Sequence, residues 1–199
     1  MPKKNVKLQD ISLEELWELF PIILRPHNPE YALWYGEEQL ALTNILKDCG
    51  IFRINHIGST AVKGLIAKPT VDILLELGDG YDRKTIIEDI LEKNGWIVMA
   101  RDDAAKTIDL NKGYTPKGFA HKVFHLHIKP PGDWSELYFR DYLQKYSDIA
   151  GKYELLKLDL KEKFERNRNA YTTAKSDFIQ KYTRTARDEF GERYTPHNE

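Results

Sequence analysis

The chain has 199 residues, long enough to bury a core of ordinary size without support from metal or disulfides. Its 30 basic and 31 acidic residues give a net charge of -1, which excludes a protein that collects nucleic acid or anionic membrane through a broad positive field. The single cysteine, Cys49, has no partner for an internal disulfide, and we find neither a signal peptide nor a bilayer-spanning run. We therefore expect one cytoplasmic domain over residues 1–199.

Two helices are predicted in residues 1–50. Ser12 and Glu15 have the spacing of a capping box, which predicts a short amphipathic helix over residues 11–20. A second helix is predicted over residues 30–48. We expect its apolar residues to pack inward: Leu33, Leu40, Leu42, Ile45 and Leu46.

The core of the sheet is predicted in residues 51–130, because the apolar periodicity there changes to that of strands. A helix over residues 83–94 between two of the strands resembles a βαβ unit. Short connections predict antiparallel pairing of the last three strands. Residues 113–120, rich in polar residues, are predicted to be a mobile loop. The strands are expected at residues 52–57, 70–77, 96–101, 106–110 and 121–129.

Residues 131–199 are predicted to form a helical C-terminal extension. Three helices are expected, over residues 134–145, 148–171 and 175–190. The middle one is predicted to be continuous, with one buried apolar stripe at helical spacing. The pattern as a whole predicts an α+β protein with a mixed sheet flanked by helices.

A loop suited to phosphate follows the first predicted strand. Gly58 would allow the backbone to approach an oxyanion, Ser59 and Thr60 offer hydroxyl and amide donors, and Lys68 supplies a positive charge. The same residues are common in ordinary turns, which is the alternative interpretation. The phosphate interpretation is favoured by Asp72, a lone carboxylate in an otherwise apolar strand, because such a group needs a partner or a cation.

These motifs resemble the signature of the GrpB family, itself placed in the polymerase β type of nucleotidyltransferase superfamily. The resemblance rests on His-Ile-Gly-Ser-Thr at residues 56–60, Lys68-Pro69 and Asp72, and on a later block with His125, His127 and Phe-Arg-Asp-Tyr at residues 139–142. It implies a nucleotidyltransferase-like fold, with Ser59 near nucleotide phosphates and Asp72 at a metal position. It implies no settled substrate.

The second acid that this superfamily usually carries is absent. It would stand two residues beyond Asp72, where this chain has Leu74, and Glu76 lies about 13 Å from Asp72 along an extended strand. His125 and His127 share one face of a predicted strand and are candidates to complete a catalytic cluster with Asp72. We expect a divalent cation there (Mg²⁺, Mn²⁺ or Zn²⁺), and imidazole ligands favour Mn²⁺ or Zn²⁺. The alternative is that both histidines are structural.

Further basic residues could line the ligand side. Arg140 is a candidate phosphate ligand, although an internal ion pair with Asp141 is an equally good interpretation, and Lys157 is a second candidate. The leading hypothesis is a metal-dependent nucleotidyltransferase that moves a nucleoside monophosphate from a triphosphate to an acceptor. A module that binds a nucleotide or another phosphorylated small molecule without catalysis is the alternative, and a metal-assisted hydrolase is a third. No autonomous nucleic-acid binding and no membrane partner are expected.

Overall fold

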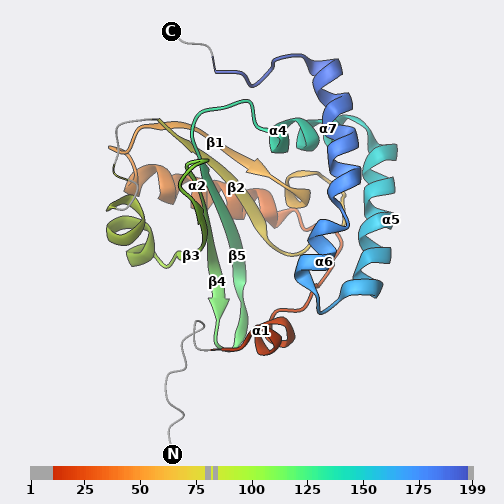
Figure 1. Cartoon of the computed structure of the whole chain (residues 1–199), viewed down its shortest axis with the longest axis horizontal. Helices are drawn as coiled ribbons and strands as arrows, with labels where there is room; N and C mark the ends of the chain where they lie inside the picture. The colour runs from red at the N-terminus through yellow and green to blue at the C-terminus, as the bar shows by residue number, and fades with distance from the viewer. Residues whose placement is uncertain (1–10, 79–81, 83–84, 197–199) are drawn as a thin grey trace, which may run out of the picture.

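The computed structural model describes residues 11–78, 82 and 85–196. A five-stranded mixed sheet forms its centre and helices flank it (Figure 1), which confirms the predicted α+β class. The described residues contain no helix that is both long and apolar enough to span a bilayer. The strands are Ile51–Ile57 (β1), Val71–Leu77 (β2), Ile97–Asp102 (β3), Thr107–Thr115 (β4) and Gly118–Lys129 (β5).

The strand order is β1-β2-β5-β4-β3, in which β2 and β5 are parallel and all other neighbours are antiparallel. The predicted antiparallel pairing of the last three strands is therefore confirmed. β2 and β3 point in the same direction, as in a βαβ unit, but β5 and β4 lie between them. The central parallel pair sets Asp72 of β2 opposite His125 of β5, which decides where the site forms.

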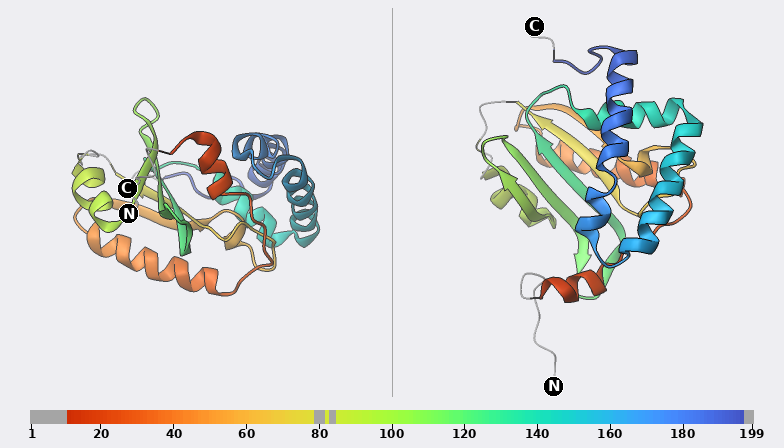
Figure 2. Two further views of the ribbon diagram at one scale, coloured as in Figure 1. Left: turned by 90° about the horizontal axis from the view of Figure 1, so that it is seen from below. Right: turned by 45° about the vertical axis from the view of Figure 1, so that its right-hand side comes forward.

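The two faces of the sheet differ in character. One is apolar and is covered by α2 (Glu30–Ile45), which packs with Ile73 and Leu75 of β2 and Leu126 of β5 in the main core. The C-terminal helices lie toward the opposite face, as the left view of Figure 2 shows. Because side chains alternate along a strand, burying Ile73 under α2 directs Asp72 toward the C-terminal helices.

The N-terminal helices agree with the sequence in the cap of α1 but not in the packing of α2. Ser12 and Glu15 form the predicted capping box at the start of α1 (Leu13–Leu19), and the Ser12 Oγ accepts from the Glu15 amide at 3.3 Å. Inward packing of Leu33 and Leu40 was wrong, because these side chains are 66% and 63% exposed. They lie on the side of α2 that does not contact the sheet.

The predicted loop over residues 113–120 is instead a β-hairpin. β4 continues to Thr115, β5 begins at Gly118, and the Thr115 Oγ1 donates to the Gly118 carbonyl at 2.8 Å. Gly113 has a φ of 90°, and a Cβ there would lie 2.3 Å from the Lys122 carbonyl oxygen, so the chain bulges at a position that only glycine fits. The hairpin was missed because glycine and proline signal a loop as readily as a bulged strand.

The helix predicted over residues 83–94 is first wound more widely than an α-helix and then more tightly. The chain is π-helical over Ile86–Leu91 (η3) and 3₁₀-helical over Glu92–Asn94 (η4), while residues 83 and 84 lie outside the described residues. Gly95 ends the segment in the left-handed conformation at a φ of 85°. This segment closes the apolar face next to α2.

The continuous helix predicted over residues 148–171 is broken in two. The first part, α5 (Ser147–Phe164), follows α4 (Ser135–Lys145), and the second part, α6 (Arg168–Thr173), precedes α7 (Ser176–Phe190). The Asn167 side chain caps α6 by accepting from the Ala170 amide at 3.0 Å. The apolar periodicity ends at Phe164, and the charged residues that follow it gave no clear sign of the break, which returns the chain toward the sheet (Figure 1).

Candidate functional site

The turn after β1 is built closely around Asp72. Ile57 pairs with Asp72 in the antiparallel register of β1 and β2, and Gly58 then turns the chain at a φ of 70° into η2 (Ser59–Ala61). A Cβ on Gly58 would lie 2.3 Å from Asp72 Oδ2. Only glycine therefore permits both the backbone conformation and the approach of the carboxylate to the turn.

Asp72, His125 and His127 come together as the sequence predicts. His125 Nδ1 lies 2.9 Å from Asp72 Oδ1, and His127 follows two residues later on the same face of β5. One ligand atom from each of the three side chains lies within 4.8 Å of the other two. Around an ion with bonds of about 2.1 Å, neighbouring ligand atoms are about 3 Å apart, so a small approach of these three side chains would let them hold a divalent cation. One carboxylate with two imidazoles suits Mn²⁺ or Zn²⁺ better than Mg²⁺.

Each histidine has a partner outside the cluster that fixes the orientation of its ring. His127 Nδ1 lies 2.7 Å from Asp109 Oδ1, and His125 Nε2 lies 2.8 Å from the Tyr114 hydroxyl. The Tyr114 hydroxyl also accepts from Arg168 at 3.1 Å. Neither partner was predicted from the sequence, although the pairing of β4 with β5, which sets Asp109 opposite His127, would have predicted the first.

Protonation of Asp72 is strongly disfavoured. Burial alone would raise the pKa of this carboxyl, but the hydrogen bond with His125 and the nearby His127 and Lys68 lower its pKa to about 2. Burial lowers the pKa of His125 below the ordinary histidine value despite the neighbouring carboxylate. An ionised Asp72 beside neutral His125 is the protonation state in which both side chains offer lone pairs to a cation.

A cavity of about 400 Å³ opens over this cluster. Eight of the nine predicted site residues line it, from the turn, the Lys68 segment, the two central strands and α5. Thr60 serves the turn itself, because its Oγ1 donates to the Thr70 carbonyl at 3.1 Å and contacts His56 Nε2 at 3.0 Å. The predicted residues brought together are Gly58, Ser59, Thr60, Lys68, Asp72, His125, His127 and Lys157.

Arg140 does not line the cavity. Its guanidinium donates to Asp141 at 2.9 Å and to the carbonyl of His56 at 3.0 Å, and it also bonds the Tyr194 hydroxyl. These contacts match the ion-pair interpretation of Arg140 and tie α4 to the end of β1. Arg140 would have to break these hydrogen bonds before it could bind phosphate directly.

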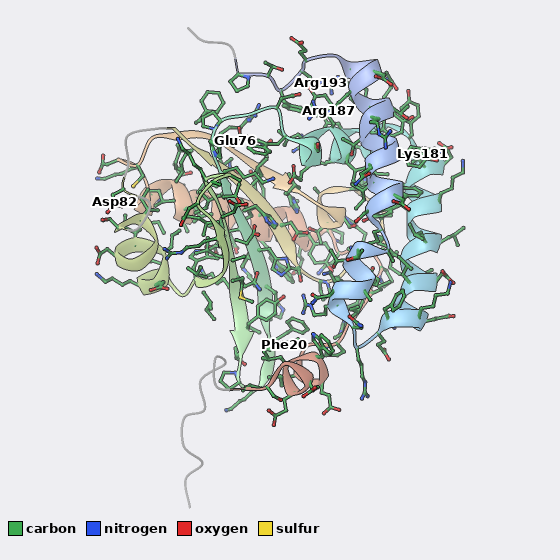
Figure 3. All side chains as sticks on the ribbon, viewed as in Figure 1. Phe20, Glu76, Asp82, Lys181, Arg187 and Arg193 are labelled. Atoms are coloured by element: carbon green, nitrogen blue, oxygen red, sulfur yellow. The ribbon has the colours of Figure 1, made fainter. Side chains whose placement is uncertain are left out.

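Glu76 also lies apart from the cluster. Its carboxylate is fully buried and binds Arg53 at 2.7 Å and the amide of Gly132 at 3.0 Å. Figure 3 shows Glu76 toward the α4 end of the sheet, far from Phe20 beside α1. Glu76 therefore has a structural ion pair and gives Asp72 no second acid.

The rest of the cavity wall is mostly cationic in its charged residues. Among the described residues that line the cavity, Asp72 is the only carboxylate, whereas Lys68, Lys157, Arg168 and Lys175 are all basic. Burial and the neighbouring Arg168 and Lys175 lower the pKa of Lys68 to about 8, and burial together with Lys175 lowers the pKa of Lys157 to about 7. Such lowering would be relieved by an anion in the cavity.

Arg168 comes from the region where the sequence predicted a continuous helix, and Lys175 from the start of the next predicted helix. Arg168 begins α6 and Lys175 lies between α6 and α7, so the break after Phe164 brings both to the cavity. The only sequence signal for the break is Asn167, whose side chain caps α6. That signal is weak within a charged helical segment.

Comparison with known proteins identifies the family. A sequence profile described as GrpB protein matches residues 21–185. This chain belongs to the GrpB family. The GrpB match includes every residue that lines the cavity.

Curated relatives and a solved structure agree with the GrpB assignment. A UPF0157 protein of Halalkalibacterium halodurans is 29% identical over 93% of both chains, and the glutamate-rich protein GrpB of Alkalihalophilus pseudofirmus is 30% identical over 79% of this chain and 91% of its own. The crystal structure of conserved protein GrpB from Enterococcus faecalis matches with a TM-score of 0.73 at 27% identity, covering 84% of this chain and 99% of that one. The GrpB fold therefore extends over most of this chain.

Proposed function

We propose that the cavity binds a nucleoside triphosphate with a divalent cation and transfers a nucleoside monophosphate to an acceptor, as in nucleotidyltransferases of the polymerase β type. The observation that carries the proposal is one cavity lined both by the Asp72, His125 and His127 cluster and by four basic side chains. A phosphate chain bridges such surfaces, because its oxygens bind cations and basic side chains alike.

Each residue has a distinct task in this proposal. Asp72, His125 and His127 hold the divalent cation, which when bound polarises the phosphate oxygens and offsets the charge that develops during transfer. The backbone at Gly58 and the Ser59 hydroxyl contact phosphate, and Lys68 neutralises it as a point charge. The fit to Mn²⁺ or Zn²⁺ follows from the imidazoles, which take the place of the missing second carboxylate.

Leu74 supports the alternative, a module that binds a phosphorylated small molecule without turnover. It occupies the position of the second acid and is fully buried in contact with Ile57 and Leu137. A site with a single carboxylate has less negative charge with which to hold two cations. Binding without release of pyrophosphate would identify this alternative.

Titration calorimetry with the four ribonucleoside triphosphates tests the proposal. Each nucleotide is titrated with Mg²⁺, Mn²⁺ or Zn²⁺, and pyrophosphate release is followed in parallel. We expect binding that depends on the cation and that is lost in Asp72→Ala. The proposal fails if no triphosphate binds with any of the cations, or if Asp72→Ala binds and turns over like the unmodified protein.

A smaller effect is expected at Asp109. Replacing it by asparagine removes the charge that orients His127 but leaves the cluster itself intact, so affinity for Mn²⁺ or Zn²⁺ should fall about 10-fold to 100-fold. Calorimetry with the metal alone measures it. The matched control is Asp159→Asn, which removes an exposed acid paired with Lys163 on α5 and should leave metal affinity unchanged. Equal affinity of both variants would show that Asp109 does not support a metal ligand.

A further inference from the structure

Ser59 has the position of a nucleophile rather than that of a turn residue alone. It follows the end of β1 and the left-handed Gly58, and it begins η2 with its side chain lining the cavity. A sharp turn between a strand and a helical segment presents a side chain at the edge of a sheet, where a ligand can reach it. Asp72 lines the same cavity, so a phosphate held by the cluster would lie within the space that Ser59 faces.

The Ser59 hydroxyl contacts a buried lysine amine. Lys157 comes from the middle of α5 and is 2% exposed, and its Nζ lies 3.1 Å from Ser59 Oγ. The same amine bonds the carbonyl of Ile66, and it lies 4.8 Å from the centre of the Tyr153 ring. Hydrogen-bond distance between a hydroxyl and a base is the first geometric requirement for an activated serine.

Lys157 forms no ion pair in the part of the chain that the structure describes. Glu154, one turn earlier on α5, directs its carboxylate to the amide of Ile66 at 3.1 Å. Burial and the charge of Lys175 lower the pKa of Lys157, the Glu154 charge raises it by less, and the charge of Lys68 lowers it further. A buried lysine among cations releases its proton readily, and its pKa of about 7 leaves a large neutral fraction at neutral pH.

We propose that Ser59 is a nucleophile and that the neutral amine of Lys157 is its general base. The inference rests on the proposed function for its substrate, a nucleoside triphosphate, and adds a covalent step at a residue otherwise assigned only to phosphate contact. A serine activated by a lysine is a known variant of the serine–base arrangement.

The step balances as follows. Ser59 Oγ forms a bond to the α-phosphorus, the bond from that phosphorus to the bridging oxygen breaks, and pyrophosphate leaves with the electron pair. The Ser59 proton moves to the Lys157 amine, which becomes an ammonium. In the second half the acceptor hydroxyl forms the new bond to phosphorus, and Ser59 Oγ departs with the proton that Lys157 returns to it. The Lys157 amine, neutral again, takes up the proton of the acceptor hydroxyl and releases it to solvent. No oxidant or further reactant is required.

The competing explanation is that Lys157 only braces the turn by joining Ser59 to Ile66 and α5. The two explanations predict different reactivity of the Ser59 hydroxyl, because a lysine that only stabilises the turn leaves this hydroxyl as unreactive as that of any other serine. A small sulfonyl fluoride reports that reactivity without any nucleotide: the serine oxygen bonds to sulfur and fluoride leaves. Methanesulfonyl fluoride is small enough for a cavity of about 400 Å³.

The experiment measures labelling of Ser59 by mass spectrometry of the full chain and its peptides between pH 5.5 and 9. We expect Ser59 to be labelled at least 10-fold faster than Ser176, at a rate that rises with pH through about 7. Lys157→Met should slow labelling at least 10-fold and remove this pH dependence, whereas Lys152→Met, which changes an exposed lysine of α5, should not. Chemical shift and thermal melting comparisons verify that each variant is folded.

The result that overturns the proposal is labelling of Ser59 no faster than that of Ser176, or equally fast labelling in Lys157→Met. Because the probe contains no phosphate, this outcome is independent of nucleotide binding. A protein that binds nucleotide with Mn²⁺, releases pyrophosphate and keeps that turnover in Ser59→Ala would likewise overturn the covalent step while the proposed function stood.

Discussion

Replacing Gly58 by alanine is expected to lower the free energy of unfolding by about 2–5 kcal/mol and to disrupt the Asp72 cluster. Alanine at a positive φ costs about 1–2 kcal/mol, and forcing an extra methyl into a packed site adds about 1–3 kcal/mol. Here the methyl would lie 2.3 Å from Asp72 Oδ2, so the carboxylate must move away from the turn. Urea unfolding measures the stability, and calorimetry with Mn²⁺ measures the site.

Gly64→Ala is the matched control. Gly64 has a φ of 82°, close to that of Gly58, but a Cβ there would meet no atom within 4 Å. It should therefore carry the backbone cost alone, about 1–2 kcal/mol, and leave cation binding intact. If the two variants lost equal stability and both still bound the cation, the contact between Gly58 and Asp72 would have no energetic role.

The sequence predicted the centre of this protein better than its edges. Gly58 and Asp72 could be found because each departs from its surroundings: a glycine ends one strand, and a lone carboxylate interrupts the apolar run of the next. His125 and His127 could be found because two residues separate them on one strand, which fixes a common face. These signals are local, and the pairing of β2 with β5 needed only to bring them together.

The cationic wall could not be predicted in the same way. Arg168 and Lys175 reach the cavity only because the chain breaks after Phe164, and charged residues on a helix give no signal of the direction in which a broken helix continues. Arg140 shows the opposite error: its charge suits phosphate, but the acid beside it in sequence, Asp141, binds it instead. Residues 113–120 were misassigned because the bulge at Gly113 depends on tertiary contact with Lys122.

The largest pH effect on stability is expected at Lys157. Its pKa is about 7 in the folded protein and about 10.5 in the unfolded chain, so between these values the unfolded state binds more protons. Stability from this group should therefore rise with pH, by up to about 1.4 kcal/mol per pH unit between pH 7 and pH 10. Below pH 7 Lys157 is protonated in the folded protein as well, so the full destabilisation from burying its unpaired charge is present.

Lys157→Met removes this dependence. Methionine occupies a similar volume without charge, although Ser59 and Ile66 lose a hydrogen bond each, which costs about 1 kcal/mol apiece. The decisive quantity is consequently the slope and not the offset: the stability of the unmodified protein minus that of the variant should rise steadily from pH 7 to pH 9. Because Lys68 and Lys175 titrate in both proteins, their contributions largely cancel in that difference.

Urea unfolding at half-unit pH intervals provides the test, with Lys152→Met as the exposed control on the same helix. The control should run parallel to the unmodified protein at every pH. Parallel curves for Lys157→Met as well would mean that Lys157 keeps an ordinary pKa in the fold. The neutral amine that can accept the Ser59 proton would then be scarce at neutral pH. The same curves therefore measure how much the free energy of unfolding is lowered by burying Lys157 as a base beside the cavity.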